Sequence, residues 1–258
     1  MNNHEIHFVS EKLSLNNIFR AQNCNAISIF SSDTCDKSFI EKFNKMGIQL
    51  ILLRSAGYDN VDLSTAQKYK IKVARVPDYS PEAIAEHIIT LILAISRNIY
   101  AGQLRVSQLN FSLVGLMGFN LSDKTVGVIG TGKIGSSLIK ILKGFGSKIL
   151  AHDLIENKTF KNDASVQYVT KTELLQKSDI VSLNLPLNEH TFHYIDFEEI
   201  EMMQNQSILI NTSRGAILNT QALLKGIDSG KISRAGIDVY ENEKEYFFSN
   251  LYINLFYI

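Results

Sequence analysis

Cysteine is scarce in this chain of 258 residues, which contains only Cys24 and Cys35. A disulfide framework needs more cysteines in a shorter, secreted chain, so the sequence argues against that class of protein. Neither cysteine has partners at the spacing of metal ligands, and no metal site is expected. We therefore expect two unpaired thiols in a reducing cytosol.

An excess of charge of one sign is also absent. Lysine plus arginine and aspartate plus glutamate are equal, at 26 residues each. A nucleic-acid-binding protein usually has a basic excess or a basic stripe, so no nucleic-acid partner is predicted. A local cluster such as Lys140, Lys143 and Lys148 is interpreted as a solvated face.

Long hydrophobic runs are missing as well. The longest apolar segment, 88–95, includes Thr90 and is far shorter than the roughly 20 residues of a membrane span. The N-terminus has no basic region followed by an apolar stretch, so no signal peptide is indicated. The sequence predicts a cytoplasmic protein without a membrane partner.

Short apolar runs rich in β-formers alternate with helical patterns in the first part of the chain. Alternation at this spacing favours a parallel sheet with crossover helices, which we assign to a first domain of residues 1–98. The expected strands are 6–9, 26–30, 49–53 and 72–76, and the expected helices are 36–46 and 63–69.

A long helix is expected at the end of this domain. Ser80 can cap it, and Pro81 suits its first position, where the missing N–H would have no partner in any case. The helix is apolar on nearly every face from 83 to 95, which predicts burial on more than one side, as at a joint between domains. His87 lies on it; a satisfied, partly buried histidine is the favoured interpretation over a functional one.

A second alternation of strands and helices follows a less regular connecting segment, 102–122. It predicts a doubly wound α/β domain, assigned to residues 99–248. Its expected strands are 125–129, 148–151, 180–185, 207–211 and 235–239, and its expected helices are 134–143, 171–176 and 221–226.

A glycine motif opens this second domain. Residues 124–135 read KTVGVIGTGKIG, with Gly130, Gly132 and Gly135 in the three positions of GxGxxG. The first glycine allows a tight turn, the second lets the backbone approach a pyrophosphate, and the third lets helix and strand pack closely. The helix that begins near Lys133 directs unpaired N–H groups and a partial positive charge toward the phosphates.

The motif by itself is weak evidence, because a structural glycine turn is a common alternative. Here it lies between an apolar strand and a helix, and a second strand then ends at Asp153. An acid about 20 residues after the motif can accept hydrogen bonds from the ribose hydroxyls of a dinucleotide. We predict dinucleotide binding, with NAD preferred over NADP because Asp153 would repel a 2′-phosphate.

Six segments, one of which contains the glycine motif, occur in a characteristic order along the chain: RSAGYDNVDL (54–63), VPDYSPEAIAEH (76–87), FSLVGLMGF (111–119), GVIGTGKIGSSLIKILKGFG (127–146), INTSRGAI (210–217) and AGIDVYENE (235–243). Together they resemble one family, the NAD-dependent D-2-hydroxyacid dehydrogenases, and most closely its D-lactate dehydrogenase branch. The likeness runs from about residue 5 to about residue 248 and implies two doubly wound parallel-sheet α/β domains, a flavodoxin-like substrate domain and a Rossmann NAD-binding domain. It also implies reduction of a small 2-keto acid such as pyruvate to the 2-hydroxy acid with NADH.

The resemblance assigns catalytic roles to Arg214, which would grip the substrate carboxylate and keto oxygen, and to Glu243, which would partner a catalytic histidine. A guanidinium suits this work because its planar fork makes paired hydrogen bonds to a carboxylate. Taken alone, Arg214 would more often be a surface arginine and Glu243 a member of an acidic run. The implied substrate-binding residues are Ser55, Ala56, Gly57 and Tyr79.

The resemblance also extends the cofactor site beyond the glycines. Asp238 would lie near the nicotinamide, and Leu185 and Pro186 would line the adenine side. A homodimer is implied as well, with the long helix and the connecting segment as candidate contacts. The implied cofactor-binding residues are Lys133, Ile134, Asp153, Leu185, Pro186, Thr191, Thr212, Ser213, Arg214 and Asp238.

The sequence departs from the family pattern near its end. The family's proton donor is a histidine well downstream of the DVYENE segment, whereas all six histidines here precede Glu243. Residues 249–258, SNLYINLFYI, do not resemble the family and are expected to be a tail produced by a frameshift or premature stop near Phe248; pairing of the tail as an edge strand is the alternative. The sequence therefore leaves two alternatives: a dehydrogenase, or a C-terminally truncated, catalytically impaired remnant that at most binds NAD.

Overall fold

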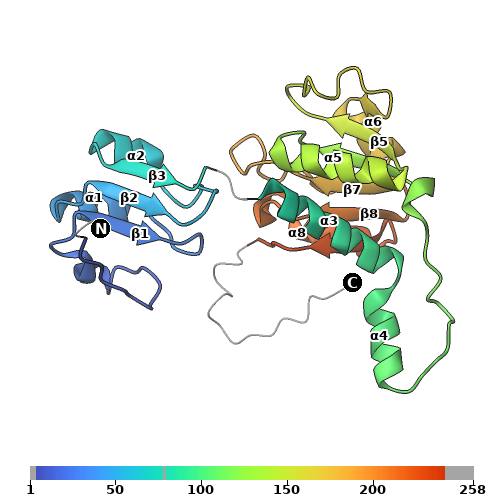
Figure 1. Cartoon of the computed structure of the whole chain (residues 1–258), viewed down its shortest axis with the longest axis horizontal. Coiled ribbons are helices and arrows are strands. Elements are labelled where there is room, and N and C mark those ends of the chain that lie inside the picture. Colours follow the sequence, from blue (N-terminus) through green and yellow to red (C-terminus); the bar gives the residue numbers. More distant parts are fainter. Residues whose placement is uncertain (1–3, 78–79, 242–258) are drawn as a thin grey trace. The chain divides into compact units, whose positions relative to one another are not determined.

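The computed structural model describes residues 4–77 and 80–241 and divides into two compact units, 1–79 and 80–258 (Figure 1). The sequence interpretation placed the boundary at 98, after the long helix. In the structure this helix, α3 (Pro81–Ser96), groups with the second unit because it packs on that unit's sheet and on its helix α5.

The first unit contains a parallel sheet in the order β1-β2-β3, covered by an apolar cluster that includes Phe43, Ile51 and the buried Cys35. Asp36 and Asp62 cap its two α-helices by accepting hydrogen bonds from backbone N–H groups of the first turns. Its elements are η1 (Ile18–Ala21), β1 (Ala26–Ile29), α1 (Lys37–Lys45), β2 (Leu50–Leu53), α2 (Leu63–Lys68) and β3 (Lys72–Arg75).

One expected strand of this unit is wrong. Residues 6–9 form no strand, and the Ile6 and Phe8 side chains are 67% and 91% exposed. A short apolar run becomes a strand only where a neighbouring strand supplies hydrogen bonds, and β1 pairs with β2 instead.

The second unit is a six-stranded parallel sheet in the order β6-β5-β4-β7-β8-β9. From β4 the chain adds β5 and β6 on one side of the sheet, and then β7, β8 and β9 on the other side of β4. The point between β4 and β7 where the strand order reverses is a switch point, and such a point forms a ligand crevice at the carboxyl ends of the strands. The strands are β4 (Thr125–Ile129), β5 (Lys148–His152), β6 (Val166–Tyr168), β7 (Ile180–Leu183), β8 (Ser207–Asn211) and β9 (Ile232–Ile237).

Helices cover both faces of this sheet, as the doubly wound prediction requires (Figure 1). Alternate residues of β8 point to opposite faces: Ile208 and Ile210 join the cluster under α3 and α5, and Leu209 joins the cluster under the other helices. The helices are α3, α4 (Ile99–Ser107), η2 (Leu121–Asp123), α5 (Lys133–Phe145), α6 (Lys171–Lys177), α7 (Phe197–Met202), η3 (Gly215–Ile217) and α8 (Thr220–Asp228).

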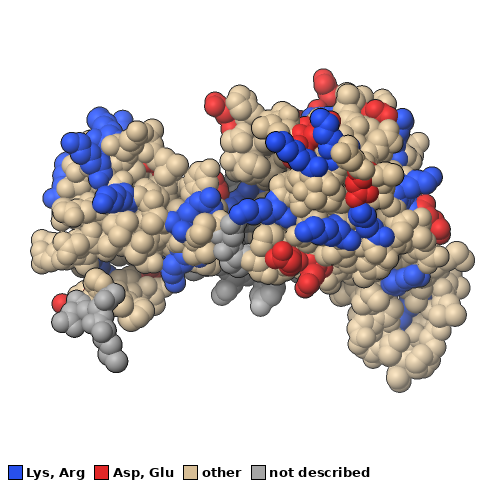
Figure 2. Space-filling view, turned by 45° about the horizontal axis from the view of Figure 1, so that its top comes forward, with Lys and Arg blue, Asp and Glu red and all other residues tan. Residues whose placement is uncertain are grey.

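The segment expected to be an irregular connection contains helix α4, followed by the loop 108–117; we call residues 99–117 the arm. The arm extends away from the sheet and shows few charged side chains (Figures 1 and 2). Arg105 of α4 holds the loop of the arm against the helix by donating hydrogen bonds to the carbonyls of Ser112 (3.0 Å) and Val114 (2.6 Å).

In the described ranges no single helix is long and apolar enough to cross a membrane. Helices α3 and α4 meet both criteria only when taken together, and they are bent by 59° where they join.

Candidate functional site

The three motif glycines occupy three physically different environments at the carboxyl end of β4. Gly130 has φ +91°, and a Cβ there would lie 2.4 Å from the carbonyl oxygen of Asn184. A Cβ on Gly135 would lie 2.0 Å from the carbonyl oxygen of Gly130, so helix α5 can approach the strand only without a side chain there. At Gly132 a Cβ would meet no atom within 4 Å. At the first and third positions the protein itself leaves no room for a side chain, whereas the second position faces open space.

Gly132 is also the N-cap of α5 and offers no side chain to the N–H groups of the first turn. These groups, with the partial positive charge of the helix terminus, suit a pyrophosphate. A groove of about 450 Å³ passes this terminus. Its lining residues are Pro81, Glu82, Gly132, Lys133, Ser136, Ser137, Lys140 and Asn157. The Ile134 side chain packs against the apolar cluster under α5, so it is the backbone of this residue that lies at the helix terminus.

Asp153, directly after β5, is joined to the glycine turn. Its Oδ2 accepts hydrogen bonds from the Thr131 N–H at 2.6 Å and the Thr131 hydroxyl at 3.0 Å. Among the described residues, its Oδ1 accepts only a longer hydrogen bond, 3.4 Å from the Ile155 N–H. One carboxylate oxygen therefore holds the turn, and the other makes only the longer contact.

A side-chain network that the sequence analysis missed supports the same turn. Asn157 donates to the Thr131 carbonyl at 3.0 Å and to the Ser136 hydroxyl at 2.9 Å. The Tyr168 hydroxyl donates to Thr131 Oγ1 at 3.1 Å and accepts from the Asn157 N–H at 2.9 Å. No spacing marks Asn157 and Tyr168 in the sequence, because they approach Thr131 only when β5 and β6 pair beside β4.

The loop after β7 closes over Gly130. Leu185 Cδ2 would lie 3.1 Å from a Cβ on Gly130, and Thr191 holds the loop by donating to the Pro186 carbonyl at 2.6 Å and accepting from the Asn188 N–H at 2.8 Å. The expected adenine-side residues therefore lie next to the glycine turn.

The loop after β8 brings Arg214 to the same edge of the sheet. Ser213 fixes this loop to the neighbouring strand by donating to the Leu183 carbonyl at 2.7 Å. Arg214 is half-buried, as is Thr212, and its Nη1 donates to the Ser213 carbonyl at 2.7 Å. A Cβ on Gly215 would lie 2.0 Å from the carbonyl carbon of Tyr240, so the arginine loop and the DVYE segment pack backbone to backbone.

Two histidine–carboxylate pairs lie beside the DVYE segment. His87 Nε2 is 3.3 Å from Asp238 Oδ1, and His193 Nε2 is 2.6 Å from Glu241 Oε1. Burial raises the pKa of the Glu241 carboxyl, but the hydrogen bonds from His193 and from the Thr220 N–H outweigh it, so this pKa lies below its ordinary value. His87 was expected to be a satisfied, partly buried histidine; it has a carboxylate partner, but its side chain is 45% exposed, so the expected burial is wrong.

In the first unit, Ser55, Ala56 and Gly57 form a loop after β2. The Ser55 hydroxyl donates to the Gly57 carbonyl at 2.8 Å, and Arg75 donates to the Ala56 carbonyl at 2.7 Å. No acceptor for the backbone N–H groups of these three residues lies in the described part of the chain. Tyr79 and Glu243, also expected at the substrate site, lie outside the described residues.

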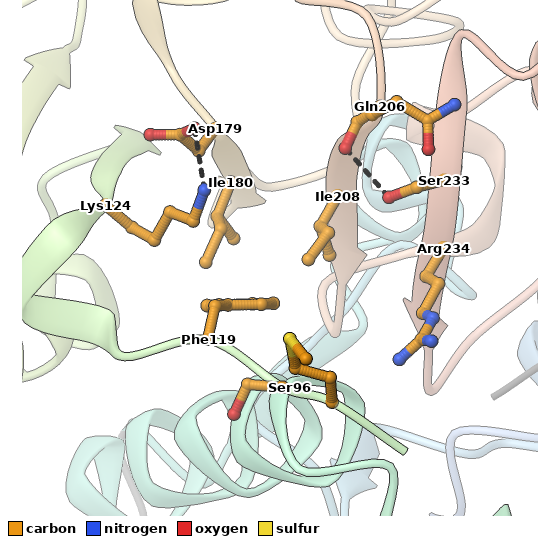
Figure 3. A pocket seen from close by; sticks show the side chains of 11 residues that line it. Ser96, Phe119, Lys124, Asp179, Ile180, Gln206, Ile208, Ser233 and Arg234 are labelled. Carbon is orange, nitrogen blue, oxygen red and sulfur yellow. Dashed lines mark hydrogen bonds and ion pairs between the residues drawn. The ribbon is translucent and has the colours of Figure 1, made fainter. Parts of the chain in front are cut away.

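A second cavity, of about 370 Å³, opens at the opposite edge of the sheet (Figure 3). Lys124, Asp179 and Gln206, which line it, each directly precede a strand. Lys124 Nζ lies 3.3 Å from Asp179 Oδ1, and the Ser233 hydroxyl donates to the Gln206 carbonyl at 2.8 Å (Figure 3). Ligands of parallel sheets bind at the carboxyl ends of strands, so the site belongs to the glycine edge.

Comparison with known proteins decides the family. The model of the D-isomer specific 2-hydroxyacid dehydrogenase NAD-binding domain matches residues 89–252. The chain belongs to this family.

Within the D-2-hydroxyacid dehydrogenases, the chain is similar to D-lactate dehydrogenase of Escherichia coli K12, with 40% identity over 95% of this chain and 74% of the relative. It is similar in structure to the pyruvate reductase of Chlamydomonas reinhardtii, with a TM-score of 0.84, 41% identity, and coverage of 94% of this chain and 71% of the other. It is also similar in structure to D-lactate dehydrogenase of Aquifex aeolicus complexed with NAD and lactic acid. The TM-score is 0.83 and the identity 35%, with coverage of 89% of this chain and 68% of the other. The predicted α/β fold, family and NAD cofactor are confirmed.

Proposed function

We propose that this dehydrogenase interconverts a small 2-keto acid and its D-2-hydroxy acid with NAD, and that pyruvate is the keto acid. The observation that supports this proposal most is that the glycine turn, with open space at Gly132, and the loop that carries Arg214 both lie at the carboxyl ends of strands of one parallel sheet. The names of two neighbours, a pyruvate reductase and a D-lactate dehydrogenase complexed with NAD and lactic acid, support the choice of pyruvate.

The proposed cofactor site extends over both halves of the sheet, the half formed by β4, β5 and β6 and the half formed by β7, β8 and β9. Asp153 would hold the adenosine ribose, and the first turn of α5, with Gly132 and Lys133, would hold the pyrophosphate. Leu185, Pro186, Thr191 and Thr212 would line the site, and Asp238 would border the nicotinamide half. When bound, NADH supplies the hydride.

The chain's own residues would bind and polarise the substrate. Arg214 would grip the carboxylate and the keto oxygen, and its positive charge would stabilise negative charge that develops on that oxygen. The N–H groups of Ser55, Ala56 and Gly57 would bind the carboxylate, with Tyr79 in contact. In the family pattern Glu243 would partner a proton-donating histidine downstream of it, whereas all six histidines of this sequence precede it.

A second candidate is a chain of 258 residues that binds NAD but turns over slowly. It is favoured by the contacts of three histidines of the second unit. His87 lies beside Asp238, His152 contacts the Val169 carbonyl, and His193 contacts Glu241, so each already has a partner in the protein. General acid catalysis contributes about 10²–10⁴-fold, which sets the size of the expected deficit.

NADH binding and pyruvate-dependent NADH oxidation, measured on the same preparation, test both candidates. Binding with turnover in the range of ordinary dehydrogenases supports the enzyme, and binding with turnover lower by about 10²-fold or more supports the second candidate. Arg214→Lys keeps the charge but loses the fork, so we expect it to abolish most turnover while NADH binding persists. No affinity for NADH in folded protein would contradict both.

We also infer a homodimer formed through the arm. Helix α4 has no buried residue. An ordered segment with this much apolar surface indicates a protein partner, and a second copy satisfies it symmetrically. The arm's exposed apolar side chains are Ile99, Tyr100, Leu104, Val106, Leu109, Phe111, Leu113, Val114 and Met117.

A cytoplasmic location stays a prediction from the sequence.

A further inference from the structure

His87 meets Asp238 because helix α3 crosses β9 at a glycine. A Cβ on Gly236 would lie 3.2 Å from Leu91 Cβ and 3.4 Å from Ile95 Cδ1, so the absence of a side chain at 236 lets the helix approach the strand. His87 is one turn before Leu91 and on the same side of the helix, and Asp238 is two residues after Gly236 on the same side of the strand. Their side chains meet at 3.3 Å, Nε2 to Oδ1.

The position of Asp238 on the sheet relates this pair to the cofactor. The half of the sheet formed by β4, β5 and β6 carries Gly132 and Asp153, the residues proposed for the pyrophosphate and the adenosine ribose. A dinucleotide that crosses the switch point extends its second nucleoside over the half formed by β7, β8 and β9. Asp238 directly follows β9, and its N–H donates to the Asn211 carbonyl of β8 at 3.0 Å. Its carboxylate therefore borders the half that would receive the nicotinamide.

The nicotinamide ring is the part of the dinucleotide whose charge changes in the reaction: it is positive in NAD⁺ and neutral in NADH. A nearby carboxylate attracts the positive ring and has no net charge to attract in the neutral one. A histidine ring nitrogen held close to the carboxylate, as His87 Nε2 is at 3.3 Å, weakens this attraction.

We propose that His87 is a positioning residue that, through Asp238, sets the relative affinity of this chain for NAD⁺ and NADH. The proposal rests on the proposed cofactor site and adds to it a residue of α3, outside the glycine motif and the arginine loop. Because the ratio of the two affinities sets how far the reduction potential of the bound dinucleotide differs from that of the free one, the pair shifts the equilibrium of hydride transfer on the protein.

A purely structural role is a poor account of the pair. Its side chains are 45% and 50% exposed, and such exposed ion pairs contribute little to folding. Replacing His87 should therefore change ligand affinity without unfolding the helix, which is anchored by Ile88, Ile92 and Ile95 in the core.

The test measures dissociation constants for NAD⁺ and NADH separately, by calorimetry on the full chain without substrate. His87→Leu leaves the carboxylate without its partner, so we expect NAD⁺ to bind more tightly and the ratio Kd(NADH)/Kd(NAD⁺) to rise about fivefold. His87→Gln restores a donor and should return the ratio toward that of the parent chain. Asp238→Asn removes the negative charge and should lower the ratio below the parent value.

His7→Leu is the matched control, because His7 makes a comparable exposed contact with Glu5 at 3.2 Å in the first unit. It should leave both constants unchanged. If His87→Leu changes both constants by the same factor, or neither, the inference is overturned while the proposed cofactor site stands. If the parent chain binds neither dinucleotide, the proposed function fails first. Thermal unfolding of each variant checks that the helix remains folded.

Discussion

Gly132 and Gly135 are identical residues, three positions apart, with opposite constraints. The first faces open space and the second faces a carbonyl oxygen of the turn. A methyl group at the first position would obstruct the proposed pyrophosphate, whereas at the second it overlaps the protein backbone.

Gly132→Ala should therefore fold normally but lose at least about tenfold in NADH affinity, because the added methyl group occupies the space proposed for the pyrophosphate. Gly135→Ala should lose about 1–3 kcal/mol of unfolding free energy, or more, because the new Cβ overlaps the Gly130 carbonyl. Urea unfolding and calorimetry with NADH separate the two effects. Equal destabilisation by both changes would contradict the assignment.

The two cysteines also differ by environment. Cys35 is fully buried, and burial, with the nearby carboxylates of Asp36, Asp33 and Asp62, raises the pKa of its thiol to about 12. Cys24 is half-buried. The thiolate is the reactive form, so at pH 8 we expect iodoacetamide to modify Cys24 and spare Cys35 until the chain is unfolded in denaturant. Peptide mass spectrometry measures this, and rapid modification of native Cys35 would contradict it.

At the scale of elements, the site is made of loops that follow parallel strands and are fixed to one another. Gly215 packs against the backbone of Tyr240, and Glu241 accepts from His193 and from the Thr220 N–H at the start of α8. Three segments are thus joined at the strand ends that carry Arg214 and Asp238.

The substitution Glu241→Gln tests the contacts of Glu241 with His193 and Thr220 through the pH dependence of the free energy of unfolding. Because the folded pKa of Glu241 is lowered, its contribution is present above the unfolded value of 4.5 and is lost as pH falls through the folded value. We expect the parent chain to lose more unfolding free energy than the variant below about pH 4.5, by about 1 kcal/mol or less because the pair is partly exposed. Urea unfolding between pH 3 and pH 7 measures the difference, and parallel curves would contradict the role.

The sequence patterns predicted elements with strong hydrophobic periodicity and missed short ones. Strand β4 and the cap and first residue of α3 agree with expectation. Strand β6 has three residues and α7 has six, too few for a period to be visible. Helix α4 was missed because its exposed apolar residues show no amphipathic pattern that a monomer would bury.

At the scale of the whole molecule, the arm predicts the assembly. Sedimentation velocity should give about twice the chain mass of 29.0 kDa. Leu113→Asp combined with Val114→Asp should shift the protein toward the monomer, because two charges would enter an apolar interface. Phe8→Asp, a change at a 91% exposed residue of the first unit, is the control and should leave the dimer intact. A parent chain that sediments as a monomer would contradict the inference.

The sequence by itself determined the family, the α/β class and the cofactor. The family is indicated by the resemblance of six segments spread along the chain. The α/β class and the cofactor depend on local features, namely alternating strands and helices and a glycine turn followed by an acid, and the physics of each acts over a few neighbouring residues. The role of Arg214 is implied by the resemblance and that of Asp153 by its distance along the chain from the glycine motif, and both roles stay predictions.

Only the tertiary structure decided which distant residues meet. The approach of α3 to Gly236 sets His87 beside Asp238, the pairing of β5 with β6 brings Tyr168 to Thr131, and the packing of α3 on the second sheet assigns that helix to the second unit. Such contacts arise from how whole elements pack, and packing depends on side chains far apart in the chain. The spacing of residues along the sequence therefore does not predict these contacts.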